Sequence, residues 1–350
     1  MKDSIKRDDA LDIAKGIGIL LVVLGHCPHV WNPLKQWIYA FHMPLFFLIS
    51  GLVWNEAAHK KRGFLTGSFV LKKFERLIVP CFLWGILYLL AHCVREGSFS
   101  LKKIIYLIYG SQAGFLRAGS LTSLWFLPCM FLTTCAFEGI VKLIYPCKRF
   151  KLFLVLASIA CASIGIIIPR LPVGYPWCLD VSFIAVALMT WGYLAKDWVE
   201  MISNKMLVTS ILCFACFLLL TLTYEANLSN ISINNADLAG RYFGNPFLYL
   251  LDALSGSGFI VLSSVLMKHF SLLCRVFTRI GKHTIPILVT HKPIVSIVSS
   301  VFERFGVPVV LGVVFGIVAA LLFSDVIYLL LRKRLPALFG EGETFQKEKA

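Results

Sequence analysis

Apolar runs long enough to cross a bilayer recur along the whole chain. A membrane-spanning helix needs about 20 mostly apolar residues. Ten segments fit that template: 11–29, 37–54, 75–94, 121–145, 152–169, 179–195, 206–224, 246–267, 284–302 and 307–331. Of the 350 residues, 58% are hydrophobic and only 15% are charged, which excludes a soluble enzyme, a disordered chain and a nucleic-acid-binding domain. We therefore expect an all-α, polytopic membrane helix bundle of about ten transmembrane helices.

The lysines and arginines that give the chain its net charge of +15 fall mainly between the apolar runs. Most of the 34 lie in alternate connecting segments, beginning with the N-terminus, and such segments face the cytoplasm in multi-pass proteins. This pattern predicts a single domain over 1–350, with 1–10 and 332–350 as cytoplasmic tails. Segment 99–116 is too short and too polar to cross, so we expect a helix lying at the outer interface.

Three ionisable residues share one face of the first apolar segment. Lys15 and His26 are eleven residues apart, which places them about 20° past three full turns and about 16 Å apart along a helix. Asp12 lies three residues before Lys15 and can pair with its ammonium group. Ionisable side chains within spans are costly, so they are candidates for function. The alternative is that Lys15 reaches the inner surface and His26 bonds a neighbouring helix.

The next two spans add a histidine and a basic pair. His42 and Pro44 lie near the outer end of the second span, so His42 should return to the level of His26. The two histidines could then handle a proton together, or His42 could simply bond a backbone carbonyl. Lys73 and Arg76 are one helical turn apart at the inner side and can clamp phosphate groups, although an ordinary positive-inside anchor fits them too.

Further polar positions carry less specific signals. Glu138 and Lys142 are four residues apart in the favourable order, which predicts that they neutralise one another. The glycines and serines of 255–258 resemble an esterase motif, but within a span they favour a close helix contact. No span shows a convincing set of metal ligands, so we expect no metal. Other candidates for a polar site are Ser50, Trp125, Asn245, Asp252 and His291.

With these residues and spacings, the sequence resembles the integral-membrane acyltransferases of the acyltransferase-3 family, closest to the fucose 4-O-acetylase-like branch. The family opens with Arg or Lys, ten residues and then His, and Lys15 to His26 fits that signature. The second-helix pattern is similar to 41–47, and the family's pair of basic residues spaced as RxxR corresponds to Lys73 and Arg76. Weaker similarities reach the ninth span, so the resemblance covers nearly the whole chain.

The resemblance implies a membrane O-acyltransferase that moves an acyl group, usually acetyl, from cytoplasmic acyl-CoA to a hydroxyl of a glycan on the far side. It implies acetyl-CoA as donor, a glycan or lipid-linked glycan of the cell envelope as acceptor, and the bacterial inner membrane as location. Nucleic acid is not expected as a partner, and the sequence leaves a homo-oligomer open. Lysine replaces the family's usual arginine at 15 and 73, and lysine lacks the planar fork that grips phosphate bidentately.

The residue roles follow from combining the resemblance with the helix geometry. His26 is the candidate general base or acyl carrier, and the sequence does not decide between these roles. Asp12 and His42 join it as catalytic candidates, Lys15, Lys73 and Arg76 are expected at the CoA phosphates, and substrate binding is expected at Ser50, Trp125, Asn245 and His291. The competing interpretation is a transporter or flippase of a lipid-linked sugar, in which the same charges line a polar route.

Overall fold

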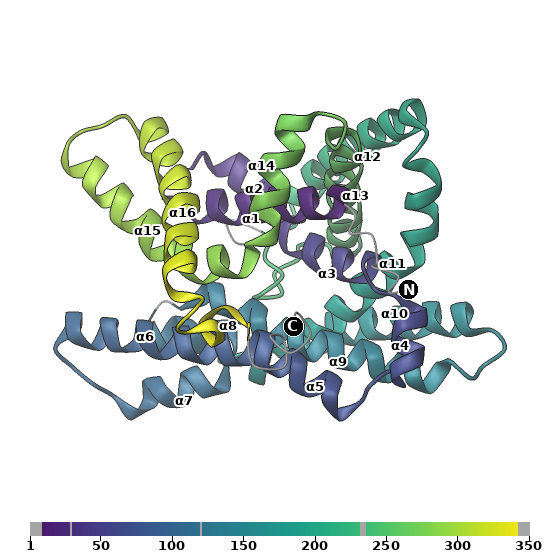
Figure 1. Ribbon diagram of the computed structural model, residues 1–350, viewed down its shortest axis with the longest axis horizontal. Helices are drawn as coiled ribbons and strands as arrows, with labels where there is room; N and C mark the ends of the chain where they lie inside the picture. Colours follow the sequence, from purple (N-terminus) through teal and green to yellow (C-terminus); the bar gives the residue numbers. More distant parts are fainter. Residues whose placement is uncertain (1–8, 29, 120, 232–235, 342–350) are drawn as a thin grey trace.

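The computed structural model describes residues 9–28, 30–119, 121–231 and 236–341 (Figure 1). These residues fold almost entirely into helices, and the only β-type pairing among them is an isolated bridge between Asp237 and Tyr242. The helices are α1 Asp9–His26, α2 Asn32–Tyr39, α3 His42–Leu52, α4 Glu56–Arg62, α5 Gly67–Lys73, α6 Val79–Glu96, α7 Leu101–Tyr109, α8 Gln112–Gly119, α9 Phe126–Ile144, α10 Phe150–Ile167, α11 Leu179–Ile202, α12 Met206–Leu228, α13 Pro246–Met267, α14 Ser271–Lys282, α15 Thr284–Arg304 and α16 Val309–Leu331.

The all-α membrane bundle expected from the sequence is confirmed. Within the described ranges, eight helices are long and apolar enough to cross a membrane, and a ninth is added if Asn32–Leu52 and Glu56–Arg62, bent by 67°, form one span. The first expected span, α1, falls outside that count because Asp9, Asp12 and Lys15 make it too charged. The number ten and the cytoplasmic placement of both ends remain predictions.

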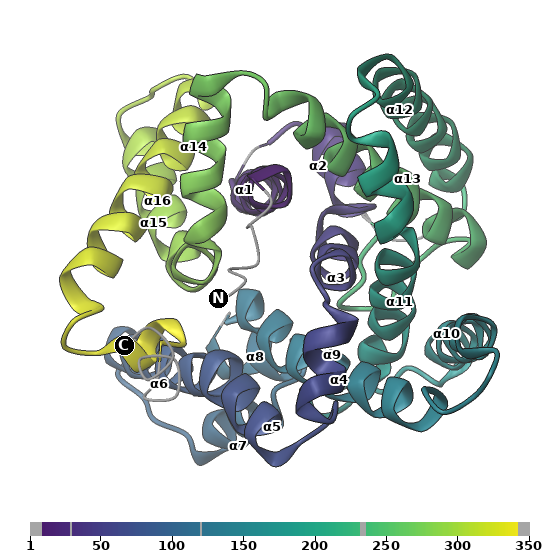
Figure 2. The same ribbon diagram turned by 45° about the vertical axis from the view of Figure 1, so that its right-hand side comes forward.

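Helix α1 lies inside the bundle rather than at its edge. Figure 2 looks along α1 and shows α3, α13, α14 and α15 arranged around it. Helix α14 approaches closest, because a Cβ added at Gly281 would lie 1.8 Å from the Asp12 carbonyl oxygen, and one at Gly16 would lie 2.3 Å from the Phe277 carbonyl oxygen. Small residues on both helices therefore permit backbone contact beside Lys15.

Helices α10, α12 and α16 cover the outside of the bundle and expose large apolar side chains along their length. Phe214 of α12 and Leu322 of α16, for example, are 66% and 61% exposed. Such surfaces suit contact with lipid tails and not with water. The polar residues of the chain's first helix therefore lie behind a lipid-facing apolar layer.

Two prolines shape the helices that carry functional candidates. Pro80 cannot donate to the carbonyl of Arg76, and the preceding turn, Phe74–Ile78, is a π-helical turn that joins α5 to α6. Pro293 lies inside α15, so the carbonyl of Val289 has no intrahelical donor; the hydroxyl of Tyr88 donates to it instead. The hydrogen bond from Tyr88 to the Val289 carbonyl ties α6 to α15.

The segment expected at the outer interface forms two short helices, α7 and α8, and neither is long enough to cross. On α7, Ile105 and Ile108 are exposed, whereas Leu107 packs against Gly85 of α6. The described part of the C-terminal tail also packs on α6, because the indole of Trp84 donates to the Leu338 carbonyl over 2.9 Å. Both segments therefore pack on the bundle, and their side of the membrane remains a prediction.

Candidate active site

The charged end of α1 is organised by one buried ion pair. The Lys15 ammonium lies 3.2 Å from a carboxylate oxygen of Asp12, which is only 1% exposed. Their spacing of three residues puts them on adjacent turns of the same face. Asp12 lies about 21 Å of helix away from His26, so the structure brings it to Lys15 and not to the histidine.

A cavity of about 370 Å³, called here the basic cavity, opens beside Lys15. Lys15 of α1, Lys73 of α5, Arg76 of the π-helical turn and Lys282 of α14 all line it, as does Ser50 of α3. The three basic residues singled out in the sequence therefore meet in one place, joined by Lys282, which sequence reasoning missed. Converging cations in a recess of low dielectric favour an anionic ligand such as a phosphate.

Glu138 of α9 is the acidic residue in the lining of the basic cavity, and its partners correct the sequence prediction. The pairing with Lys142 is wrong: Lys142 is exposed, whereas Glu138 is 1% exposed and accepts hydrogen bonds from the Trp54 indole (2.9 Å) and from His59. Arg62 adds a contact of 3.4 Å. A spacing of four on one helix is worth only about 0.5 kcal/mol, which buried tertiary partners readily exceed.

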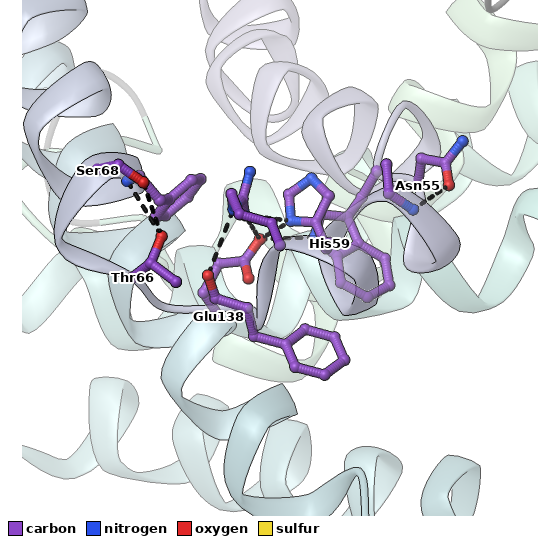
Figure 3. A network of polar contacts seen from close by, with 10 residues as sticks. Asn55, His59, Thr66, Ser68 and Glu138 are labelled. Carbon is purple, nitrogen blue, oxygen red and sulfur yellow. Dashed lines mark hydrogen bonds and ion pairs between the residues drawn. The ribbon is translucent and has the colours of Figure 1, made fainter. Parts of the chain in front are cut away.

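Figure 3 shows the His59 ring directed at Glu138 across the gap between α4 and α9. The chain segments around this contact are fixed by helix caps. The side chain of Asn55 accepts from Ala58 N–H (3.0 Å) at the start of α4, and Thr66 accepts from Phe69 N–H (3.3 Å) at the start of α5. The network thus holds the short helices that border the basic cavity.

Three histidines from three helices share one hydrogen-bonding pattern. Nδ1 of His26 lies 2.8 Å from the Val22 carbonyl, Nδ1 of His42 lies 2.9 Å from Ile38, and Nδ1 of His291 lies 2.9 Å from Ile287. A carbonyl only accepts, so each Nδ1 carries the proton and each neutral ring presents a lone pair at Nε2. That is the tautomer required of a base or nucleophile acting through Nε2.

His26 and His291 form the closest pair of these rings. Their centroids are 5.0 Å apart with the planes inclined by 66°, whereas the ring that lies against His42 is Tyr39, at 4.8 Å. His291 is fully buried, and within the described chain its Nε2 has no hydrogen-bond partner. The sequence offered both His42 and His291 as companions of His26; the structure places the imidazole of His291 directly beside it.

The remaining sequence candidates have separate surroundings. Ser50 donates to the Phe46 carbonyl (2.8 Å) while lining the basic cavity. Trp125 is buried against Phe126 in the turn before α9. Asn245 is exposed, does not line the basic cavity, and caps α13 by accepting hydrogen bonds from two backbone N–H groups, which gives it a structural task.

Three further polar residues are explained by contacts that local sequence does not show. Arg241, 2% exposed, donates to the carbonyls of Gly165 (3.0 Å) and Ile168 (2.6 Å) and so caps the end of α10. Asp252 accepts from the hydroxyl of Thr223 on α12. Asp325 pairs with Arg279 over 2.6 Å. In the described residues no three His, Cys, Asp or Glu side chains are grouped so that they could hold a metal ion.

Comparisons with known proteins identify the family of the membrane bundle. The acyltransferase domain family matches residues 8–329. A nodulation protein NolL from Sinorhizobium fredii is 30% identical over 236 residues, covering 60% of this chain and 55% of that protein. A NolL from Mesorhizobium japonicum is 27% identical over 229 residues, covering 61% and 56%. The chain therefore matches about half the length of these curated relatives.

No solved structure matches the chain significantly. The family match spans α1 to α16 almost completely and includes the basic cavity as well as all three histidines. With its apolar helices, the protein is a multi-pass membrane protein. The chain belongs to the acyltransferase-3 family, whose members are integral-membrane acyltransferases.

Proposed function

We propose that the protein transfers an acyl group, most directly acetyl, from acyl-CoA to a hydroxyl of a cell-envelope glycan. One observation carries the proposal: the basic cavity at Lys15 and the histidine pair at His26 lie at opposite ends of one helical stripe, about 16 Å apart along α1. An anion-binding recess and a basic imidazole are the two parts that such a transfer needs. The family membership supports the reaction class.

The basic cavity is the proposed donor site. Its cations, Lys15, Lys73, Arg76 and Lys282, suit the phosphates of a nucleotide donor, and acyl-CoA supplies the activated acyl thioester. Asp12 then has a positioning role, because its buried carboxylate holds the Lys15 ammonium at the cavity wall. The lysines at 15 and 73 bind phosphate as point charges, without the bidentate geometry of arginine.

His26 is the proposed base. Its Nδ1–H is engaged by the Val22 carbonyl, which leaves Nε2 to take the proton of the acceptor hydroxyl as that oxygen forms its bond to the acyl carbon. The bond between the acyl carbon and sulfur then breaks, and CoA leaves as a thiolate that receives the proton from the imidazolium. His291 packs against the ring and restricts its orientation. If His26 instead carries the acyl group itself, a radiolabelled acetyl group will stay on the protein after rapid denaturation at neutral pH; a general base leaves none.

The acceptor and the membrane belong to the proposal as well. We assign the acceptor to the glycans of a bacterial cell envelope and the protein to the inner membrane, with the donor site facing the cytoplasm. The resemblance of the sequence to the acyltransferase-3 family, which implies a glycan acceptor, supports this assignment.

The test uses purified protein in nanodiscs with acetyl-CoA, following release of the CoA thiol. We expect acetyl-CoA to bind and thiol to appear, and glycans extracted from the native envelope to accelerate release. Replacing both Lys73 and Arg76 by glutamine should abolish saturable donor binding, because two cations leave the cavity. Wild-type protein that binds no acyl-CoA would overturn the proposal and favour transport of a lipid-linked sugar.

A further inference from the structure

A second cavity, called here the distal pocket, lies between α6 and α15. It has a volume of about 370 Å³ and is lined by Tyr88, His92 and Arg95 of α6, by Lys292 and Ser296 of α15, and by Ser123. The hydrogen bond from Tyr88 to the carbonyl that Pro293 frees bridges the two helices at this pocket. The distal pocket is separate from the basic cavity, since no lining residue is common to both.

The distal pocket is positively charged. Three of its lining residues, His92, Arg95 and Lys292, are basic, and none of the described residues lining it is acidic. Glu96, which does not line the pocket, pairs with His92 (3.1 Å) and with Lys103 (2.6 Å). Lys292 is half-buried and donates to the Thr122 hydroxyl over 2.6 Å. Cations held this way inside a membrane protein favour an anionic ligand.

The position of Lys292 connects the distal pocket to the chemistry. Lys292 directly follows His291, whose ring lies 5.0 Å from that of His26. A molecule whose anionic group occupies this pocket therefore contacts α15 one residue from His291, whose ring packs against the proposed base.

The surroundings of the pocket are apolar and exposed. On α6, Leu90 and Val94 are 53% and 84% exposed, and on α15 Ile297 and Val301 are 65% and 45% exposed. These side chains flank the basic residues on the same two helices. A positively charged pocket bordered by surface suited to lipid tails fits a ligand that carries both a phosphate and a hydrocarbon chain.

We propose that the distal pocket binds the phosphate of a lipid-linked glycan, so that the acceptor is presented to His26 from the bilayer. This inference rests on the proposed acyltransferase function and specifies its acceptor class. The group that the pocket recognises is a phosphate anion, and a free phosphate ion presents the same group as the lipid-linked glycan. Arg95 and Lys292 hold the phosphate, and the exposed apolar residues of α6 and α15 contact the chain.

The experiment measures binding of dodecyl phosphate to the protein in nanodiscs of neutral phosphatidylcholine, beside inorganic phosphate and dodecyl maltoside. We expect dodecyl phosphate to bind at least about tenfold more tightly than either comparison probe. Arg95→Gln and Lys292→Gln should each weaken it about tenfold or more, the effect of losing one charge-assisted hydrogen bond. Lys102→Gln removes an exposed charge that does not line the pocket and should change nothing.

Each binding result supports or overturns a stated part of the proposal. Equal binding of dodecyl phosphate and inorganic phosphate overturns the lipid-linked acceptor, and equal binding by wild type and both pocket variants overturns the site. Lys292→Arg should restore affinity, and Arg95→Gln changes an exposed residue, so a folding defect cannot imitate the result. Acetyl-CoA binding, measured in parallel, separates the two hypotheses: its absence defeats the proposed function, whereas its presence without dodecyl phosphate binding defeats only this inference.

Discussion

The contact between α1 and α14 gives a prediction whose size follows from the structure. In Gly281→Ala the new Cβ would lie 1.8 Å from the Asp12 carbonyl oxygen and must move about 1.6 Å to reach the 3.4 Å of ordinary contact. The obstacle is backbone, so α14 itself has to shift. Because Gly281 and Lys282 line the basic cavity opposite Lys15, the shift widens the proposed donor site.

The matched control is Gly139→Ala in the middle of α9, where an added Cβ has 3.6 Å of clearance from Leu65. Both substitutions improve helix propensity by about 1 kcal/mol. Overpacking costs about 1–3 kcal/mol, and a clash with backbone lies at the upper end of that range. We therefore expect Gly281→Ala to be less stable than Gly139→Ala by at least about 2 kcal/mol.

The assay is thermal unfolding in detergent together with acetyl-CoA titration. Gly281→Ala should melt below wild type and bind acetyl-CoA about tenfold to a hundredfold more weakly, since a displacement of about 1 Å can cost that much. Gly139→Ala should melt slightly above wild type and bind acetyl-CoA as wild type does. Wild-type stability and donor affinity in Gly281→Ala would refute the close α1–α14 packing and its role in shaping the cavity.

Three other substitutions test separate contacts. Lys15→Ala should weaken acetyl-CoA binding about tenfold or more, through loss of a charge-assisted hydrogen bond, while Lys15→Arg retains it; titration calorimetry that finds the Ala variant unchanged removes Lys15 from the donor site. Glu138→Gln and His59→Gln should each lower the melting temperature, and the double substitution should cost less than the sum of the two, because both break the contact between His59 and Glu138; fully additive losses would contradict the pairing. Arg241→Met should destabilise by more than about 3 kcal/mol, because it leaves several α10 carbonyls without their donor, and an unchanged unfolding midpoint would refute that capping role.

The sequence predicted those parts of the fold that depend on local residue patterns. Apolar runs of about 20 residues identify spanning helices because the bilayer imposes that length, and the eight expected segments from 75–94 onward all coincide with long helices. The Lys15–Asp12 pair follows from helical spacing alone. Helical spacing predicted that Lys73 and Arg76 could clamp phosphate together, the resemblance assigned them to the same ligand as Lys15, and the structure shows all three lining one cavity.

The parts that sequence could not predict are contacts between distant segments. His26 and His291 lie 265 residues apart, and nothing in either local sequence indicates that their rings meet. Glu138 was misassigned because its spacing to Lys142 is visible in the sequence, whereas its partners Trp54 and His59 approach from another helix pair. The packing of α14 on α1 is likewise invisible until Gly16 and Gly281 are seen to face each other's backbone.

The central claim, that His26 performs the chemistry while the basic cavity holds the donor, is tested most directly by His26→Ala. Purified wild type, His26→Ala and the exposed-histidine control His269→Ala would be compared for acetyl-CoA affinity and for release of the CoA thiol. The account predicts that His26→Ala binds acetyl-CoA as wild type does but releases no thiol, while His269→Ala does both. Full turnover by His26→Ala would contradict it.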